Sequence, residues 1–93
     1  MVYMQMWMRP FMTGVYKVVL PRIDVAMESG RISEWVKKVG DRVSRGEVVA
    51  IVETEKAAVE ITSEVDGVLT KILHNVGEEV KVGETIAEIE VDK

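Results

Sequence analysis

The chain has 93 residues, no cysteine, one histidine and a formal net charge of −4, with 30% of its residues charged. This length fits one small domain with a thin core, and the composition excludes a disulfide framework, a cysteine nucleophile and a histidine or cysteine metal cluster. The acidic balance argues against nucleic acid, and no apolar run approaches the roughly 18 residues of a membrane-spanning helix, so we expect a cytoplasmic protein with no membrane partner.

Residues 1–14 differ from the rest of the chain. Five methionines fall in the first twelve positions, and Arg9 is the only charge. The segment resembles neither a signal peptide nor a basic amphipathic anchor. It could be a disordered tail, a segment that docks on the domain or on a partner, or an extension ahead of a true start at Met12. We favour Met12 because a regular pattern begins directly after it, and we predict a domain over residues 15–91 with the tail outside it.

The first strand is predicted over residues 15–20, which are mostly β-branched or aromatic. Pro21 ends it, because proline cannot donate a hydrogen bond to a sheet. Residues 22–29 continue as a strand or a loop, and we expect Gly30 to break this segment.

A hairpin is predicted in the middle of the chain. The apolar runs at residues 48–52 and 58–61 flank the polar stretch Glu53–Ala57. This arrangement places Lys56 at the exposed tip. An exposed lysine is ordinarily only a solvated charge, so the interest of Lys56 rests on how the rest of the chain supports its turn.

A shift of 37 residues overlays the two halves of the chain. The matched positions are glycines, acidic residues and apolar residues: Gly30/Gly67, Gly40/Gly77, Gly46/Gly83, Glu47/Glu84, Ile32/Leu69, Val43/Val80 and Ala50/Ala87. Glycines at fixed offsets indicate backbone positions that need positive φ or close approach. Because neither half is large enough to bury its own apolar face, we expect two similar halves packed about a pseudo-twofold axis.

The secondary structure of each half is ambiguous from the pattern. Apolar residues at spacings of three and four would suit an amphipathic helix, namely Ile32, Trp35, Val36, Val39 and Val43. The β-branched content and the turn-like Gly40-Asp41 favour strands followed by turns. We therefore predict an all-β sandwich or flattened barrel, in which the repeat places the Lys56 turn and the chain ends at opposite ends.

The stretch Glu53-Thr54-Glu55-Lys56-Ala57 resembles the attachment motif of lipoyl domains, which dihydrolipoyl acyltransferase (E2) components of 2-oxo acid dehydrogenase complexes carry. The resemblance covers residues 15–91. Flanking segments fall at the family's spacing, among them Leu20-Pro21, Glu28-Ser29-Gly30, Val39-Gly40-Asp41 and Val82-Gly83-Glu84. The commonest family motif has aspartate before the lysine, whereas this chain has Glu55, which keeps the charge.

The resemblance implies a barrel-sandwich hybrid of two four-stranded antiparallel sheets related by a pseudo-twofold axis. It implies that Lys56 carries lipoic acid in amide linkage and acts as a swinging arm for acyl groups and reducing equivalents. It implies that Glu55 and Ala57, together with residues 23–29, influence which dehydrogenase accepts the domain. The chemistry belongs to the cofactor and to other enzymes, so no catalytic residue or metal is implied.

The implied partners are a lipoate ligase or an octanoyl/lipoyl transferase, a thiamine-dependent 2-oxo acid dehydrogenase (E1), the acyltransferase core (E2) and dihydrolipoamide dehydrogenase (E3). The isolated domain is expected to be monomeric. Acidic residues are expected around the tip, chiefly for solubility and secondarily for complementarity to these enzymes: Glu53, Glu55, Glu60, Glu64 and Asp66.

Three alternatives remain beside this interpretation. A biotin carrier domain shares the fold, but its motif usually has methionine on both sides of the lysine, where this chain has Glu55 and Ala57. A glycine-cleavage H-type protein is usually longer. An interaction module with an unmodified lysine would use the apolar N-terminal tail to bind a partner.

Overall fold

The computed structural model describes residues 14–92, and the predictions for residues 1–13, including a start at Met12, lie outside them. Within this part the chain forms eight strands and no helix, so no helix there is long and apolar enough to cross a membrane. The strands are β1 (Val15–Val19), β2 (Ser29–Trp35), β3 (Arg42–Val43), β4 (Val48–Glu53), β5 (Ala58–Thr62), β6 (Gly67–Ile72), β7 (Glu79–Lys81) and β8 (Thr85–Val91).

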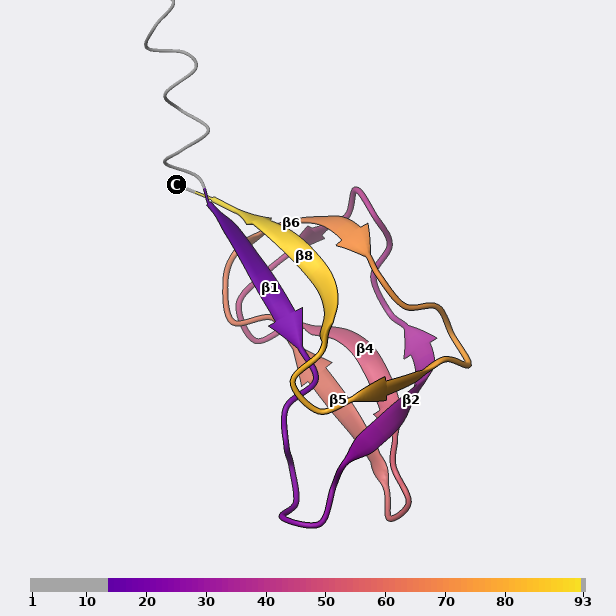
Figure 1. Ribbon diagram of the computed structural model, residues 1–93. Helices are drawn as coiled ribbons and strands as arrows, with labels where there is room; N and C mark the ends of the chain where they lie inside the picture. The colour runs from indigo at the N-terminus through magenta and orange to yellow at the C-terminus, as the bar shows by residue number, and fades with distance from the viewer. Residues whose placement is uncertain (1–13, 93) are drawn as a thin grey trace, which may run out of the picture.

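The strands form two four-stranded antiparallel sheets, which lie one over the other (Figure 1). One sheet has the order β1-β8-β6-β3 and the other β5-β4-β2-β7. Advancing each strand number by four, with β8 followed by β1, converts the first order into the second. The predicted all-β fold with an internal pseudo-twofold axis is therefore confirmed.

The symmetry extends to single residues. A bulge lies between Ile32 and Glu34 where β2 pairs with β4, and its counterpart lies between Leu69 and Lys71 where β6 pairs with β8. These two pairs are 37 residues apart, as the sequence repeat requires. A bulge bends its strand and increases the local twist, so both sheets bend at equivalent places.

Gly30 does not break a strand, and that prediction is wrong. It is the second residue of β2 and pairs with Val80 of β7. A β-carbon at Gly30 would lie 2.5 Å from Cγ1 of Val52, so the close approach of β4 favours glycine at this position. A glycine inside a strand often marks such an approach rather than a strand end.

Four of the glycines matched by the repeat occupy turns with positive φ between 87° and 97°: Gly40, Gly46, Gly77 and Gly83. Such angles are accessible to glycine at little cost. The hydrogen bonds at these turns also repeat: Gly46 N–H donates to the carbonyl of Ser63 at 2.7 Å, and Gly83 N–H donates to that of Leu20 at 2.9 Å.

The core lies between the two sheets and consists of one apolar cluster: Val18, Leu20, Met27, Ile32, Val43, Val49, Ala50, Val52, Ile61, Leu69, Val80, Ile86, Ala87 and Ile89. Val43 and Val80, matched by the repeat, are both buried. Val36 and Val39, which would have continued a helical stripe, are exposed in the loop after β2. The helical spacing therefore reflected a buried strand followed by an exposed apolar loop.

The β4–β5 hairpin lies at one end of the domain, and the start of β1 and the end of β8 lie at the other (Figure 1). The two corners are equivalent under the pseudo-twofold axis. Thr54 N–H donates to the carbonyl of Ala57 at 2.8 Å, and in the other corner Val91 N–H donates to that of Gly14 at 3.3 Å. The predicted opposition of tip and chain ends is present in the described residues.

Candidate functional site: the β4–β5 hairpin

The site is the turn that joins β4 to β5. Antiparallel pairing continues outward to Glu53 and Ala58, and Glu55 and Lys56 form the tip. Two-residue hairpin loops usually adopt turns that require positive φ. Neither tip residue has positive φ, so the turn accepts ordinary side chains but needs other support.

Thr54 supplies this support through its side chain. Its hydroxyl oxygen accepts hydrogen bonds from the N–H groups of Lys56 at 3.3 Å and Ala57 at 3.1 Å, and it donates to the carbonyl of Ala57 at 2.8 Å. Sequence reasoning did not assign a role to Thr54. The available signal was a threonine ahead of a polar turn, because threonine hydroxyls often bond the backbone two or three residues on.

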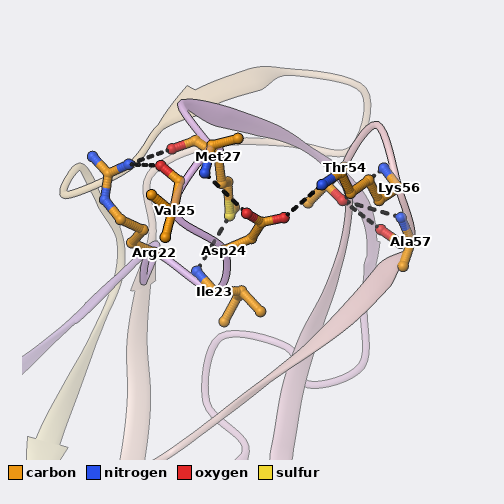
Figure 2. Close-up of polar contacts among 9 residues, drawn as sticks. Arg22, Ile23, Asp24, Val25, Met27, Thr54, Lys56 and Ala57 are labelled. Atoms are coloured by element: carbon orange, nitrogen blue, oxygen red, sulfur yellow. Dashed lines mark hydrogen bonds and ion pairs between the residues drawn. The ribbon is translucent and has the colours of Figure 1, made fainter.

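The turn places Lys56 at the tip, as predicted, with Glu55 and Ala57 exposed on either side. The Lys56 side chain is 70% exposed, so its primary amine is accessible. Its Nζ lies 3.1 Å from Oδ2 of Asp24, which belongs to the loop between β1 and β2 (Figure 2). This ion pair was not predicted, since 32 residues separate its members and no sequence pattern connects them.

The β1–β2 loop, residues 20–28, has internal bonds of its own (Figure 2). Oδ1 of Asp24 accepts the N–H of Ala26 at 2.9 Å, and the Asp24 carbonyl accepts the N–H of Met27 at 2.9 Å. Arg22 donates to the carbonyls of Val25 and Met27 at 3.1 and 2.8 Å. The loop is fixed to the core at Met27, which is only 7% exposed.

Two neighbours hold the pKa of the Asp24 carboxyl below its usual value of 3.8. The larger cause is the hydrogen bond from the Ala26 N–H, and the second is the hydrogen bond and charge of Lys56. Both favour the ionised carboxylate. Asp24 is therefore a carboxylate whose two oxygens are held by different segments of the chain.

A groove of about 440 Å³ lies between the β1–β2 loop and the hairpin. Ile23, Met27 and Val59 give it apolar walls. Three carboxylates also line it, and Lys56 is the only cation among its described lining residues; the carboxylates are Asp24, Glu28 and Glu55. The Lys56 amine therefore lies at the rim of a groove that has acidic and apolar walls.

The predicted acidic ring around the tip is only partly correct. Glu53 and Glu55 lie at the turn, and Glu60 lies within β5 opposite Ile51. Glu64 lies beyond the other end of β5, near Tyr16, whose pKa is raised by burial and secondarily by the Glu64 charge. Asp66 accepts the N–H groups of Arg45 and Asp92 near the chain ends. β5 runs away from the tip, so residues that follow it lie at the other end of the domain although they are close to the turn in sequence.

Within residues 14–92, no group of three histidine, cysteine, aspartate or glutamate residues could hold a metal ion. The chemical handle at this site is one accessible primary amine on a supported turn. Two pseudo-symmetric sheets that present a single lysine on a hairpin tip define the carrier domains, whose prosthetic group is attached through the lysine amine.

The chain belongs to the biotin/lipoyl family, whose model, described as "Biotin-requiring enzyme", matches residues 16–93. The chain is 44% identical over 71 residues to the dihydrolipoyllysine-residue succinyltransferase component of the 2-oxoglutarate dehydrogenase complex of Staphylococcus saprophyticus, a match that covers 76% of this chain and 17% of that one. The chain spans less than a fifth of the length of such relatives.

Two solved structures are similar. The lipoyl domain of the 2-oxoglutarate dehydrogenase complex of Azotobacter vinelandii has a TM-score of 0.65 and 32% identity, over 78% of this chain and 92% of that one. The urea carboxylase of Kluyveromyces lactis has a TM-score of 0.71 and 29% identity, over 82% of this chain and 6% of that one. The sequence relatives and the Azotobacter lipoyl domain together support a lipoyl carrier role rather than a biotin carrier role.

Proposed function

We propose that Lys56 carries lipoic acid on Nζ and that the domain is the swinging arm of a 2-oxo acid dehydrogenase complex. The observation that carries this proposal is the position of Lys56: its side chain is 70% exposed, at the tip of a hairpin that the Thr54 hydroxyl stabilises. An exposed amine on a protruding turn suits an arm that must enter the active sites of other enzymes. The family membership and the lipoyl-domain relatives support the same assignment.

Attachment joins the lipoyl carbonyl carbon to Nζ as a secondary amide. The lysine ammonium loses two of its three N–H protons and its charge, and the bond between the lipoyl carbonyl carbon and the leaving group of the activated donor breaks. A lipoate ligase or an octanoyl/lipoyl transferase supplies that donor. The attached dithiolane provides the redox and acyl-transfer chemistry, and the domain contributes tethering, which raises the concentration of the carrier at each site.

The proposed users of the arm are a thiamine-dependent dehydrogenase, an acyltransferase core and dihydrolipoamide dehydrogenase. This assignment follows the relatives, which are named as components of 2-oxoglutarate and pyruvate dehydrogenase complexes. Glu55 and Ala57 flank the amine, and the β1–β2 loop lies beside it. These residues are therefore the ones that an enzyme would contact while it acts on the arm.

The test is intact-mass spectrometry of the 93-residue chain after incubation with lipoate and a lipoate ligase, and separately with biotin and a biotin ligase. We expect one lipoyl adduct on the wild type and on Lys71→Ala, which removes an exposed lysine from β6. We expect no adduct on Lys56→Ala, with unfolding unchanged within about 0.5 kcal/mol because the side chain is exposed. A biotin adduct alone would indicate the carrier domain of a carboxylase instead. An adduct that persists in Lys56→Ala would refute Lys56 as the attachment site.

A further inference from the structure

Among the described residues, the ion pair of Asp24 with Lys56, at 3.1 Å, is the only side-chain hydrogen bond between the β1–β2 loop and the hairpin tip (Figure 2). The proposed modification acts on this same Nζ atom. An ammonium group has a full charge and three donors, whereas the secondary amide that replaces it is neutral and has one N–H. The modification therefore removes the attraction that the ion pair provides.

We propose that the Asp24–Lys56 ion pair is a latch that favours the position of the β1–β2 loop against the hairpin while Lys56 is unmodified, and that modification of Lys56 removes this preference. In its lipoyl form this inference rests on the proposed function, but the latch itself requires only that Lys56 loses its charge. The loop would then report the state of the lysine to any enzyme that contacts this end of the domain.

The charges around the groove favour release once the lysine is neutral. Asp24, Glu28 and Glu55 line the groove, and Lys56 is the only cation among its described lining residues. Three carboxylates without that cation repel one another, and neither latch partner is buried, with side chains 70% and 38% exposed. Water can therefore hydrate Asp24 as soon as the pair is broken.

The loop should move as a unit instead of unfolding. Its internal bonds do not involve Lys56: Asp24 keeps the Ala26 N–H, and Arg22 keeps the carbonyls of Val25 and Met27. Met27 keeps the end of the loop in the core. The change is thus a wider groove with an unpaired Asp24 carboxylate on its rim, which offers a contact to a cationic side chain of an enzyme that uses the loaded arm.

The size of the effect is limited because exposed ion pairs are weak and are screened by salt. We expect the ratio of latched to released loop to change by about threefold or less, and the change to shrink at high ionic strength. Such a shift is measurable by NMR, because exchange between the two loop positions averages the chemical shifts in proportion to their populations.

The experiment compares four forms of the chain by NMR: the unmodified wild type, the lipoylated wild type, Lys56→Gln and Asp24→Asn. The first readout is the pKa of the Asp24 carboxyl. We expect it to rise toward 3.8 in the lipoylated form and in Lys56→Gln, without reaching it, because the Ala26 hydrogen bond remains. The Glu47 carboxyl, whose pKa is held down by Ser44 and Lys37, is the control within each spectrum and should not change.

The second readout is the set of amide shifts over residues 22–27. We expect the lipoylated form, Lys56→Gln and Asp24→Asn to move them in the same direction, and lipoylation of Asp24→Asn to add nothing further. Shifts confined to residues 54–58, or an unchanged Asp24 pKa, would overturn the latch. Failure of enzymatic lipoylation would count against the proposed function alone, since Lys56→Gln tests the latch without it.

Discussion

The backbone of Gly67 approaches Glu90 so closely that a β-carbon on Gly67 would lie 2.1 Å from the Glu90 carbonyl oxygen. Its counterpart Gly30 meets a side chain instead, Cγ1 of Val52 at 2.5 Å. A side chain can move more easily than the backbone of a central strand. We expect Gly67→Ala to lower the free energy of unfolding by about 3 kcal/mol and Gly30→Ala by about 1 kcal/mol. Urea titration of both variants measures this order, and equal losses would contradict it.

Thr54→Val should weaken the hairpin tip. The substitution keeps the shape of the side chain but removes the hydroxyl that bonds Lys56, Ala57 and the Ala57 carbonyl. We expect a loss of about 1 kcal/mol in unfolding free energy, because water partly replaces these exposed bonds. The rate of lipoylation should also fall, and Thr54→Ser should restore both quantities. A Thr54→Val variant that is lipoylated at the wild-type rate would show that the hydroxyl does not position the lysine.

The decline of folding stability at acidic pH should depend on Glu47. Its pKa is held below the usual 4.5, first by the Ser44 N–H and second by Lys37. A lowered pKa in the folded state contributes stability above pH 4.5, and that contribution is lost as the pH falls through the folded-state value. Glu47→Gln should therefore flatten the decline of stability below pH 4.5, and Lys37→Gln should do so less. The check is thermal unfolding between pH 6 and 3, and an identical slope in Glu47→Gln would exclude this role.

Trp35 connects the end of β2 to the loop that follows β6. Its indole N–H donates to the carbonyl of His74 at 2.9 Å. Trp35→Phe keeps an aromatic ring but loses this bond, so we expect a loss of about 1 kcal/mol. Hydrogen exchange should accelerate at Gly77, which lies in the same loop and whose N–H donates to the carbonyl of Ile32 in β2. If hydrogen exchange at Gly77 in Trp35→Phe were as slow as in the wild type, the Trp35–His74 hydrogen bond would not be what restrains this loop.

Much of the fold was predictable because its determinants are local or repeated. Strands β4 and β5 follow from their β-branched runs, and the pseudo-twofold axis follows from glycines at a fixed offset. Gly30 was misassigned because glycine marks both turns and close approaches, and only the position of Val52 decides between them. Periodicity alone could not decide between strand and helix; the β-branched content and the turn-like Gly40-Asp41 favoured strands, and the resemblance to lipoyl domains implied the same.

The candidate site was predictable in its central residue and not in its surroundings. Lys56 at a hairpin tip follows from two strands and a polar turn between them. Asp24 lies 32 residues away in a loop without periodicity, so its contact depends on how the β1–β2 loop folds over the groove. Glu64 and Asp66 were placed near the tip by sequence distance, although β5 carries the chain away from it.

The two equivalent corners show that the packing of the sheets and the order of the strands along the chain determine different features of the domain. The bond from Thr54 to Ala57 recurs between Val91 and Gly14, so the architecture contains two matching tips. Only one of them is closed by a continuous turn. A circular permutant that links residue 92 to residue 14 and opens between Glu55 and Lys56 would keep every strand pair and transfer the closed turn to the other end. The end of the domain that can present a lysine is thus chosen by the order of the strands along the chain, and not by the packing of the sheets.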